Sequence, residues 1–356
     1  MQKKIIALAV AGLASTAAFA QSNVTIYGIA DVGIAQVRSN GSLTSTQVVS
    51  GGLSTSRIGF KGVEDLGNGL KALFTLEYRL DMDKNTTIGG NFANGTTNAS
   101  GPARQQFVGL TGGFGTAVAG RLQTTAFDWQ GKYITLAATA FDGYNKMTGA
   151  YRINLSNDSR AENAVAYISP SMGGVTVALN HAFALEQGAS ATANNYSATL
   201  VGVYYDNGPL SVGFVGEKLQ GGGASEAVEA TDLALGASYD FKVVKLTGTY
   251  QTTKNNATSG VAAKFNSIYH LGAQIPVSAK GTVHVQWAQN NAKTTLGDDN
   301  GKGLSVAYTH ALSKRTTAYA GIGYLDNSGN GSSYSYGVSR AEGSSNIIAA
   351  GLRHAF

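Results

Sequence analysis

The sequence predicts an all-β protein: a 16-stranded antiparallel transmembrane β-barrel with short periplasmic turns, long external loops and an inward-folded third loop. Three observations favour this fold. Runs that alternate between apolar and polar residues recur about 16 times along the chain. The connectors between these runs alternate between short and long, and both ends of the chain are typical of an exported β-barrel.

The first residues are typical of a secretory signal peptide. Lys3 and Lys4 precede the apolar run Ile5–Val10, which is too short to cross a bilayer as a helix, and Ala18-Phe19-Ala20 forms an Ala-x-Ala cleavage site. We therefore expect a cleaved signal peptide over residues 1–20 and one barrel domain over residues 21–356. Export, together with a final alternating strand that ends in an aromatic residue, indicates the bacterial outer membrane.

The strands are predicted from period-2 alternation bounded by turn residues. In the first run, Ile26 and Val32 share one face, whereas Thr25 and Asp31 share the other. The predicted strands are Val24–Arg38, Arg57–Glu64, Leu70–Leu80, Arg104–Gly112, Gly115–Leu122, Ala164–Ser169, Val175–Ala184, Ser197–Asp206, Leu210–Lys218, Asp232–Asp240, Val243–Thr252, Ser267–Pro276, Gly281–Gln289, Gly303–Ala311, Thr316–Tyr324 and Ile347–Phe356.

The connectors are of two alternating kinds. The short ones are rich in Gly, Asn, Asp and Ser, and Asn207-Gly208 is a strong hairpin signal. The long ones are polar, and they cover about 39–56, 81–103, 123–163, 185–196, 219–231, 253–266, 290–302 and 325–346. A soluble β-sandwich also has many short strands, but it has no reason to alternate connector length so regularly. The connectors therefore favour a membrane barrel.

Composition agrees with a barrel whose outer face is apolar and whose lumen is polar. Charged residues make up 13% of the chain and hydrophobic residues 43%, with 47 glycines, and the mean hydropathy is near zero. No stretch of the mature chain approaches 18 consecutive apolar residues, which excludes a helical membrane protein. The absence of cysteine excludes disulfides, thiol chemistry and Cys-based metal sites.

The mature chain is mildly basic. The precursor carries a formal charge of +5, and removal of Lys3 and Lys4 leaves 24 basic against 21 acidic residues, or +3. This excess, without dense Lys/Arg runs, does not indicate nucleic-acid binding.

Tyrosine is abundant, with 17 copies, and many lie near the ends of predicted strands. We interpret these as aromatic girdles at the two membrane interfaces, although the ordinary β-propensity of Tyr is an alternative for each one. The tyrosines concerned are Tyr27, Tyr78, Tyr204, Tyr205, Tyr239, Tyr269, Tyr308 and Tyr324.

The connector at about 123–163 is interpreted as a constriction loop inside the lumen. It contains two aromatic clusters, Phe127–Tyr133 and Phe141–Tyr144, whose rings would pack on the inner wall while Asp128 and Asp142 face water. The alternative is an external loop that packs on its neighbours.

Four arginines are expected on the wall opposite this loop. Arg57 and Arg79 flank the first tight turn at similar depth, Arg121 lies about six residues above the second turn, and Arg160 ends the long loop. Facing Asp128 and Asp142 across a pore, they would create a transverse field that favours small anions. For each arginine the alternative is a salt bridge that only stiffens the wall.

Signatures of catalysis are missing from the sequence. It has no Gly-x-Ser-x-Gly, no His-Glu-x-x-His, no phosphate loop and no dinucleotide fingerprint, and its five histidines lack metal-ligand spacing. We therefore expect no enzyme activity, no cofactor and no metal site.

The chain resembles the general diffusion porins of β-proteobacteria, of the Neisseria, Burkholderia and Comamonas type. The residues that carry the resemblance are Val24–Asp31, Ser56–Ala72, Arg104–Leu110, Gly113–Thr116, Gly120-Arg121 and Gly351–Phe356. The resemblance implies a homotrimer of 16-stranded barrels with an inward third loop and often anion preference. It also implies that Phe356 is recognised by the barrel-assembly machinery. Arg57 and Arg121 match family positions, whereas Arg79 and Arg160 depend on the predicted topology.

The predicted function is a water-filled channel for passive diffusion of small hydrophilic solutes and ions, with a preference for anions because basic residues line it. The alternatives are a substrate-specific channel, or a barrel that acts as an adhesin or structural anchor. Outer-membrane lipid and lipopolysaccharide are expected to surround it. Small residues at Gly28, Ala30, Gly109 and Gly120 are candidates for close subunit contact in a trimer, with lipid-facing glycine as the alternative.

Overall fold

The structure is a computed structural model that describes residues 23–39, 44–84, 88, 103–148, 160–185, 196–223, 226–255, 265–294, 297–329, 335–336 and 343–356. The predicted signal peptide at residues 1–20, and residues 149–159 of the predicted constriction loop, lie outside these ranges. No helix among the described residues is both long enough and apolar enough to cross a membrane.

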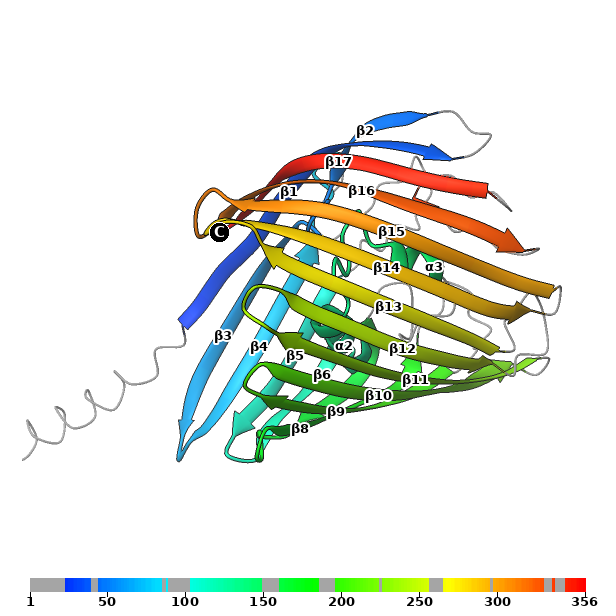
Figure 1. The fold of residues 1–356 in the computed structure, drawn as a ribbon. Coiled ribbons are helices and arrows are strands. Elements are labelled where there is room, and N and C mark those ends of the chain that lie inside the picture. The colour runs from blue at the N-terminus through cyan, green and yellow to red at the C-terminus, as the bar shows by residue number, and fades with distance from the viewer. Residues whose placement is uncertain are drawn as a thin grey trace, which may run out of the picture.

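The described strands form a single antiparallel sheet that closes on itself (Figure 1). The first strand pairs with the last, from Ile29↔Ala355 to Ser39↔Ser345, so the barrel has no free edge. The strands are β1 (Asn23–Ser39), β2 (Ser45–Ser50), β3 (Arg57–Gly67), β4 (Leu70–Arg79), β5 (Ala103–Gly112), β6 (Gly115–Gln123), β7 (Arg160–Ile168), β8 (Val175–Leu185), β9 (Tyr196–Asn207), β10 (Leu210–Gly223), β11 (Glu226–Asp240), β12 (Lys245–Asn255), β13 (Phe265–Pro276), β14 (Gly281–Thr294), β15 (Gly297–Ala311), β16 (Thr316–Gly329) and β17 (Gly343–Ala355).

The predicted number of strands is confirmed. β2 and β3 both pair with β1, β2 with its second half and β3 with its first half. They therefore occupy one position end to end, and the 17 strands fill sixteen positions around the barrel.

Each wall strand alternates between a lumen side and an outer side. In β15, Ser305 and Ala307 are buried inside the barrel, whereas Leu304 is 50% exposed and Tyr308 is 39% exposed on the outside. The exposed apolar row is what a strand that faces hydrocarbon requires, because no protein core covers it.

The tyrosines predicted to form girdles do not all lie on the outer wall. Tyr27 and Tyr204 point inward, where their hydroxyls donate to Glu77 Oε2 and to the carbonyl of Thr125. Five are exposed on the outer wall, as predicted: Tyr205, Tyr239, Tyr269, Tyr308 and Tyr324. The eighth, Tyr78, is half-buried, and its hydroxyl accepts from Gln106 Nε2.

Two predicted loops are strand instead. β10 and β11 stay paired as far as Gly223↔Glu226, and β14 and β15 as far as Thr294↔Gly297, so most of residues 219–231 and 290–302 belongs to the sheet. A ladder needs only backbone hydrogen bonds. Beyond the membrane nothing demands alternating side chains, which is why the sequence pattern did not reveal these extensions.

The third loop enters the barrel, as predicted, over its described residues. Helix α2 (Thr125–Tyr133) begins at Thr124, whose hydroxyl accepts from the backbone N–H of Phe127, and a second helix, α3 (Gly143–Thr148), follows. Both helices lie within the barrel in Figure 1, with α2 against β8 to β12 and α3 against β14 to β16.

Glycines on the inner wall make room for this loop. A Cβ on Gly213 or Gly236 would lie 2.5–2.6 Å from the Tyr133 ring, and a Cβ on Gly272 would lie 2.2 Å from Thr135 Oγ1. Trp129, Tyr133 and Tyr144 are fully buried, and Trp129 Nε1 donates to the carbonyl of Gly213 at 2.9 Å. The loop is therefore packed into the wall like a core element.

The C-terminus closes the barrel against β1. The backbone N–H of Phe356 donates to the carbonyl of Gly28, and the N–H of Gly28 donates to the carbonyl of Phe356, both at 3.1 Å. A Cβ on Gly28 would lie 2.3 Å from the Phe356 ring, and a Cβ on Gly120 would lie 2.1 Å from the carbonyl oxygen of Gln106. These two glycines are thus required by contacts within the chain itself.

Candidate pore constriction

A buried carboxylate shapes the wall beside the pore. Asp31 on β1 is fully buried and accepts hydrogen bonds from the backbone N–H groups of Leu53 and Ser54, at 2.8 and 2.6 Å, and from the Tyr319 hydroxyl at 2.7 Å. These bonds hold the turn between β2 and β3 against the inner wall. They thereby fix the backbone that precedes Arg57.

Arg57 lies on the inner face of β3, directly opposite Arg79 in the β3–β4 ladder. Its Nε donates to the carbonyl of Thr55 at 2.9 Å, and its Nη1 lies 3.8 Å from Glu77 Oε1. The distance to Glu77 makes this a loose ion pair, and the side chain keeps 21% of its surface exposed. Arg57 is therefore available to solutes in the lumen.

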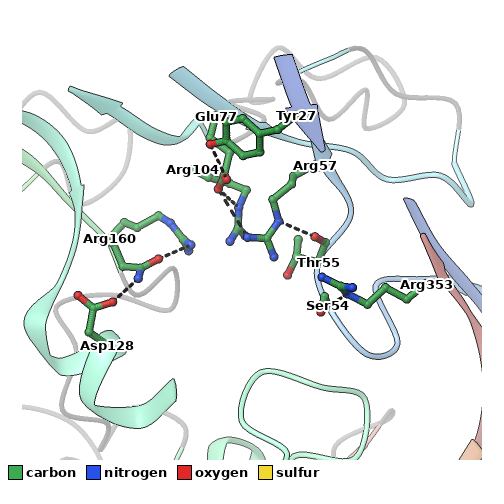
Figure 2. Close-up of polar contacts among 10 residues, drawn as sticks. Tyr27, Ser54, Thr55, Arg57, Glu77, Arg104, Asp128, Arg160 and Arg353 are labelled. Atoms are coloured by element: carbon green, nitrogen blue, oxygen red, sulfur yellow. Dashed lines mark hydrogen bonds and ion pairs between the residues drawn. The ribbon is translucent and has the colours of Figure 1, made fainter. Parts of the chain in front are cut away.

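Side chains from three strands meet at the Glu77 carboxylate (Figure 2). It is 3% exposed, and it accepts from Arg104 Nε at 2.6 Å and from the Tyr27 hydroxyl at 3.0 Å. Arg104 reaches it because the β4–β5 register shifts between Glu77 and Tyr78. Such a bulge redirects a side chain to the other face of a sheet.

Arg160 approaches from the other side, at the start of β7. Its guanidinium lies 5.1 Å from the centroid of the Phe127 ring, and its Nη2 donates to Gln123 Oε1 at 3.3 Å. Gln123 in turn donates to Asp128 of α2. Gln123 thus links Arg160 and Asp128, both of which are labelled in Figure 2.

Arg353 of β17 completes a set of four arginines. Its Nε donates to Ser54 Oγ at 3.0 Å, and in Figure 2 it lies beside Thr55, next to Arg57. We call Arg57, Arg104, Arg160 and Arg353 the arginine group. Against its four guanidiniums stand three carboxylates, Glu77, Asp128 and Asp31, the last opposite Arg353 in the β1–β17 ladder, which leaves an excess of one positive charge.

Asp142 does not face water, in contrast to the prediction. It is 2% exposed and accepts hydrogen bonds from the backbone N–H groups of Ala138 and Asn145, at 2.6 and 3.1 Å, and from Gln286 Nε2 at 3.3 Å. Burial raises the pKa of this carboxyl, and the hydrogen bonds oppose that rise. Asp142 holds the loop together and ties it to β14.

Two predicted arginines have other partners and are not counted in the arginine group. Arg79 is 44% exposed, and its Nε donates to Asp81 at 2.7 Å. Arg121 is opposite Gln106 in the β5–β6 ladder and lies two residues after Ala119, which is exposed on the outer wall. Its Nε donates to the carbonyl of Ala103 at 2.6 Å, and its Nη1 pairs with Glu162. Alternation counted from Ala119 therefore assigns Arg121 to the outer side of the sheet, whereas the prediction assigned it to the lumen.

Arg104, Arg353 and Asp31 were missed in the sequence. Arg104 belongs to a recognised strand, but regular alternation gives it the same face as Gln106 and Val108, and only the bulge reverses this. Arg353 lies near the C-terminus, far in sequence from the other three. Asp31 was assigned to the polar face of β1, and this position was the one signal that could have indicated its role.

Comparison with known proteins agrees with the barrel. The model of the family described as Gram-negative porin matches residues 7–330. The chain belongs to the Gram-negative porin family. Membership implies a channel in the outer membrane. The expectation of no enzyme activity is supported only to this extent, that the family is one of channels.

Individual relatives support this assignment. The chain is 36% identical to outer membrane porin protein 32 of Delftia acidovorans, with 100% of both chains covered. It is 31% identical to a major outer membrane protein P.IB of Neisseria meningitidis over 61% of this chain and 59% of the relative. Among solved structures, an anion-selective porin from Comamonas acidovorans matches with a TM-score of 0.77 and 30% identity, over 94% of this chain and 100% of the other. This porin is therefore an outer-membrane diffusion channel.

Proposed function

We propose that this porin admits small hydrophilic solutes by passive diffusion and prefers anions to cations. The observation that carries the proposal is the arginine group, in which Arg57 and Arg104 pair with one buried carboxylate, Glu77, and Arg160 and Arg353 lie on the same stretch of wall. Arginine stays protonated at any pH at which the barrel works, so the excess positive charge is permanent.

The position of the charges makes them effective. Asp31 and the turn before Arg57 fix one side, whereas Gln123 and Phe127 fix Arg160 on the other. Rigid charges beside a lumen that is narrowed by a packed loop act on ions at short range, where solvent screening is weakest. A passing anion gains energy from this field, and a cation loses it.

A relative supports the same direction of selectivity. The Comamonas acidovorans structure is described as an anion-selective porin, and it covers nearly the whole of this chain. The arginine group and the relationship to this porin therefore both support anion preference.

The reversal potential across a KCl gradient tests the proposal. Purified porin in planar bilayers should give large conductance steps and a reversal potential that lies between zero and the equilibrium potential of chloride. A reversal potential at zero or on the potassium side would contradict anion preference and leave only a general diffusion channel.

We further propose the assembly that the family resemblance implies. The chain would be exported by its signal peptide, inserted by the barrel-assembly machinery with Phe356 as part of the recognised end, and would form a homotrimer among lipid and lipopolysaccharide. A trimeric form is described for OmpT of Vibrio cholerae, which shares this fold at 14% identity. Native mass spectrometry of the extracted protein tests the trimer, and a monomer in mild detergent would contradict it.

A further inference from the structure

A cavity of about 300 Å³ lies on the inner wall beside the arginine group. We call it the mouth pocket. Its lining includes Thr55, Arg79, Asp81, Lys146, Val49 and Ile347. It thus lies between the end of β4, the turn before β3 and helix α3 of the inward loop. No part of the constriction described above accounts for it.

The pocket is cationic on one side. Lys146 and Arg79 line it together with a single carboxylate, Asp81. Arg79 Nε holds that carboxylate at 2.7 Å, and the Asp81 side chain is only 8% exposed. Among the residues that the structure describes, no carboxylate lies within salt-bridge distance of the Lys146 ammonium. One positive charge therefore remains for a ligand.

The other side of the pocket is apolar. Val49 and Ile347 line it, and Ile347 is 5% exposed. A bare inorganic anion would leave this side without a contact, whereas a purely apolar solute would leave the ammonium without one. Pockets of this size take ligands that combine an apolar body with one well-placed polar group.

The pocket also adjoins the permeation path. Thr55 lines it, and the carbonyl of the same residue accepts the hydrogen bond from Arg57 Nε. Thr55 therefore separates a carboxylate bound near Lys146 and Arg79 from Arg57 of the arginine group. Arg79 of the pocket also lies opposite Arg57 in the β3–β4 ladder, so a cationic side chain of the pocket neighbours the arginine group.

We propose that the mouth pocket is a binding site for small carboxylates with a compact apolar body, of which benzoate is an example. Lys146 and Arg79 bind the carboxylate, and Val49 and Ile347 contact the apolar body. The site deepens the proposed anion channel and rests on it, because it gives that channel a preference among organic anions. It predicts that such solutes pause in the pore and interrupt the current carried by chloride.

The test is the block of single-channel current in KCl by sodium benzoate added to both sides of the bilayer. Acetate supplies the charge without the apolar body, and benzamide supplies the body without the charge, so benzoate should block at a lower concentration than either. Lys146→Gln should raise the half-blocking concentration of benzoate about fivefold, as expected for one partly exposed ionic contact. Lys84→Gln, an exposed lysine outside the pocket, is the matched control and should leave it unchanged.

A second variant examines the apolar side without altering charge. Val49→Phe fills part of the cavity and should also weaken the benzoate block, and only folded channels contribute to the record. Benzoate block that is equal in wild type, Lys146→Gln and Val49→Phe would overturn the site. Failure of the anion channel itself is separate, because it appears as a cation-side reversal potential of the wild type in KCl alone.

Discussion

Replacing Arg57 by Gln removes one charge from the arginine group and leaves its frame intact. Glu77 keeps its bonds to Arg104 at 2.6 Å and to Tyr27 at 3.0 Å, because Arg57 is only loosely paired with it at 3.8 Å. Glutamine retains a donor that can reach the carbonyl of Thr55. Selectivity should therefore change without loss of the fold.

The size of the effect follows from Coulomb's law. A chloride ion at about 4 Å from a guanidinium in bulk water gains about 1 kcal/mol, and more where water is partly excluded. Loss of that charge lowers the local chloride population about fivefold and raises that of potassium by a similar factor. Since three guanidiniums remain and salt screens part of the field, we expect the chloride-to-potassium permeability ratio to fall by at least about fivefold.

The assay is the reversal potential of reconstituted Arg57→Gln channels across a tenfold KCl gradient. Arg315→Gln is the matched control, because Arg315 is exposed in the turn between β15 and β16 and the same charge is lost there. A permeability ratio that is the same in both variants would refute the assignment of selectivity to the arginine group.

Five further outcomes are expected. Arg121→Gln should change the reversal potential by no more than a control variant, because alternation assigns its side chain to the outer face; a shift as large as that of Arg57→Gln would show that it acts on the lumen. Asp142→Asn should lower the stability of the seated loop by about 1–3 kcal/mol, because a buried acceptor of several N–H groups is replaced, and the channel record should show more frequent closures. Burial raises the pKa of the Asp142 carboxyl, so the protonated form stabilises the seated loop. This stabilisation is complete below the ordinary pKa of Asp and is lost as pH rises through the pKa of the folded protein. Closures should therefore increase from about pH 4 upward in wild type and not in Asp142→Asn. Gly236→Ala should lower the unfolding temperature of the barrel on heated gels, at a cost of about 1–3 kcal/mol from the clash with Tyr133, whereas Gly216→Ala should be tolerated because its Cβ meets Leu233 at an ordinary 3.5 Å; equal behaviour of the two would argue against a rigid seat for the loop. Deletion of Phe356 should reduce the amount of folded porin in the outer membrane, since it removes the contacts with Gly28, and an unchanged amount would count against its role in assembly.

The barrel was predictable because its constraints repeat. Each strand must present apolar residues to lipid and polar residues to the lumen, so alternation is visible in the sequence itself. β2 was not recognised, because Ser45–Ser50 pairs with β1 through backbone groups in a segment without alternating side chains. The strand extensions to Gly223 and Gly297 were missed for the same reason.

The site was predictable only in part, because it depends on local departures from regularity. Arg57 and Arg160 were identified, and the structure brings them to the same stretch of wall. Arg104 depends on a bulge, and no residue pattern in β5 announces it. The aromatic clusters indicated an inward loop, but they could not show that Asp142 turns away from water to bind the backbone of its own loop.

Glu77 explains how so many like charges can share one wall. Four guanidiniums without a counterion would repel one another and would be costly to hold in place, since each is fixed by the packed wall. One carboxylate beneath Arg57 and Arg104 reduces that cost. Because it is itself buried, it is screened from the lumen by the arginines that it stabilises. A solute in the pore therefore meets the positive charges first, and the same carboxylate that makes the arginine group stable leaves the anion preference of the pore in place.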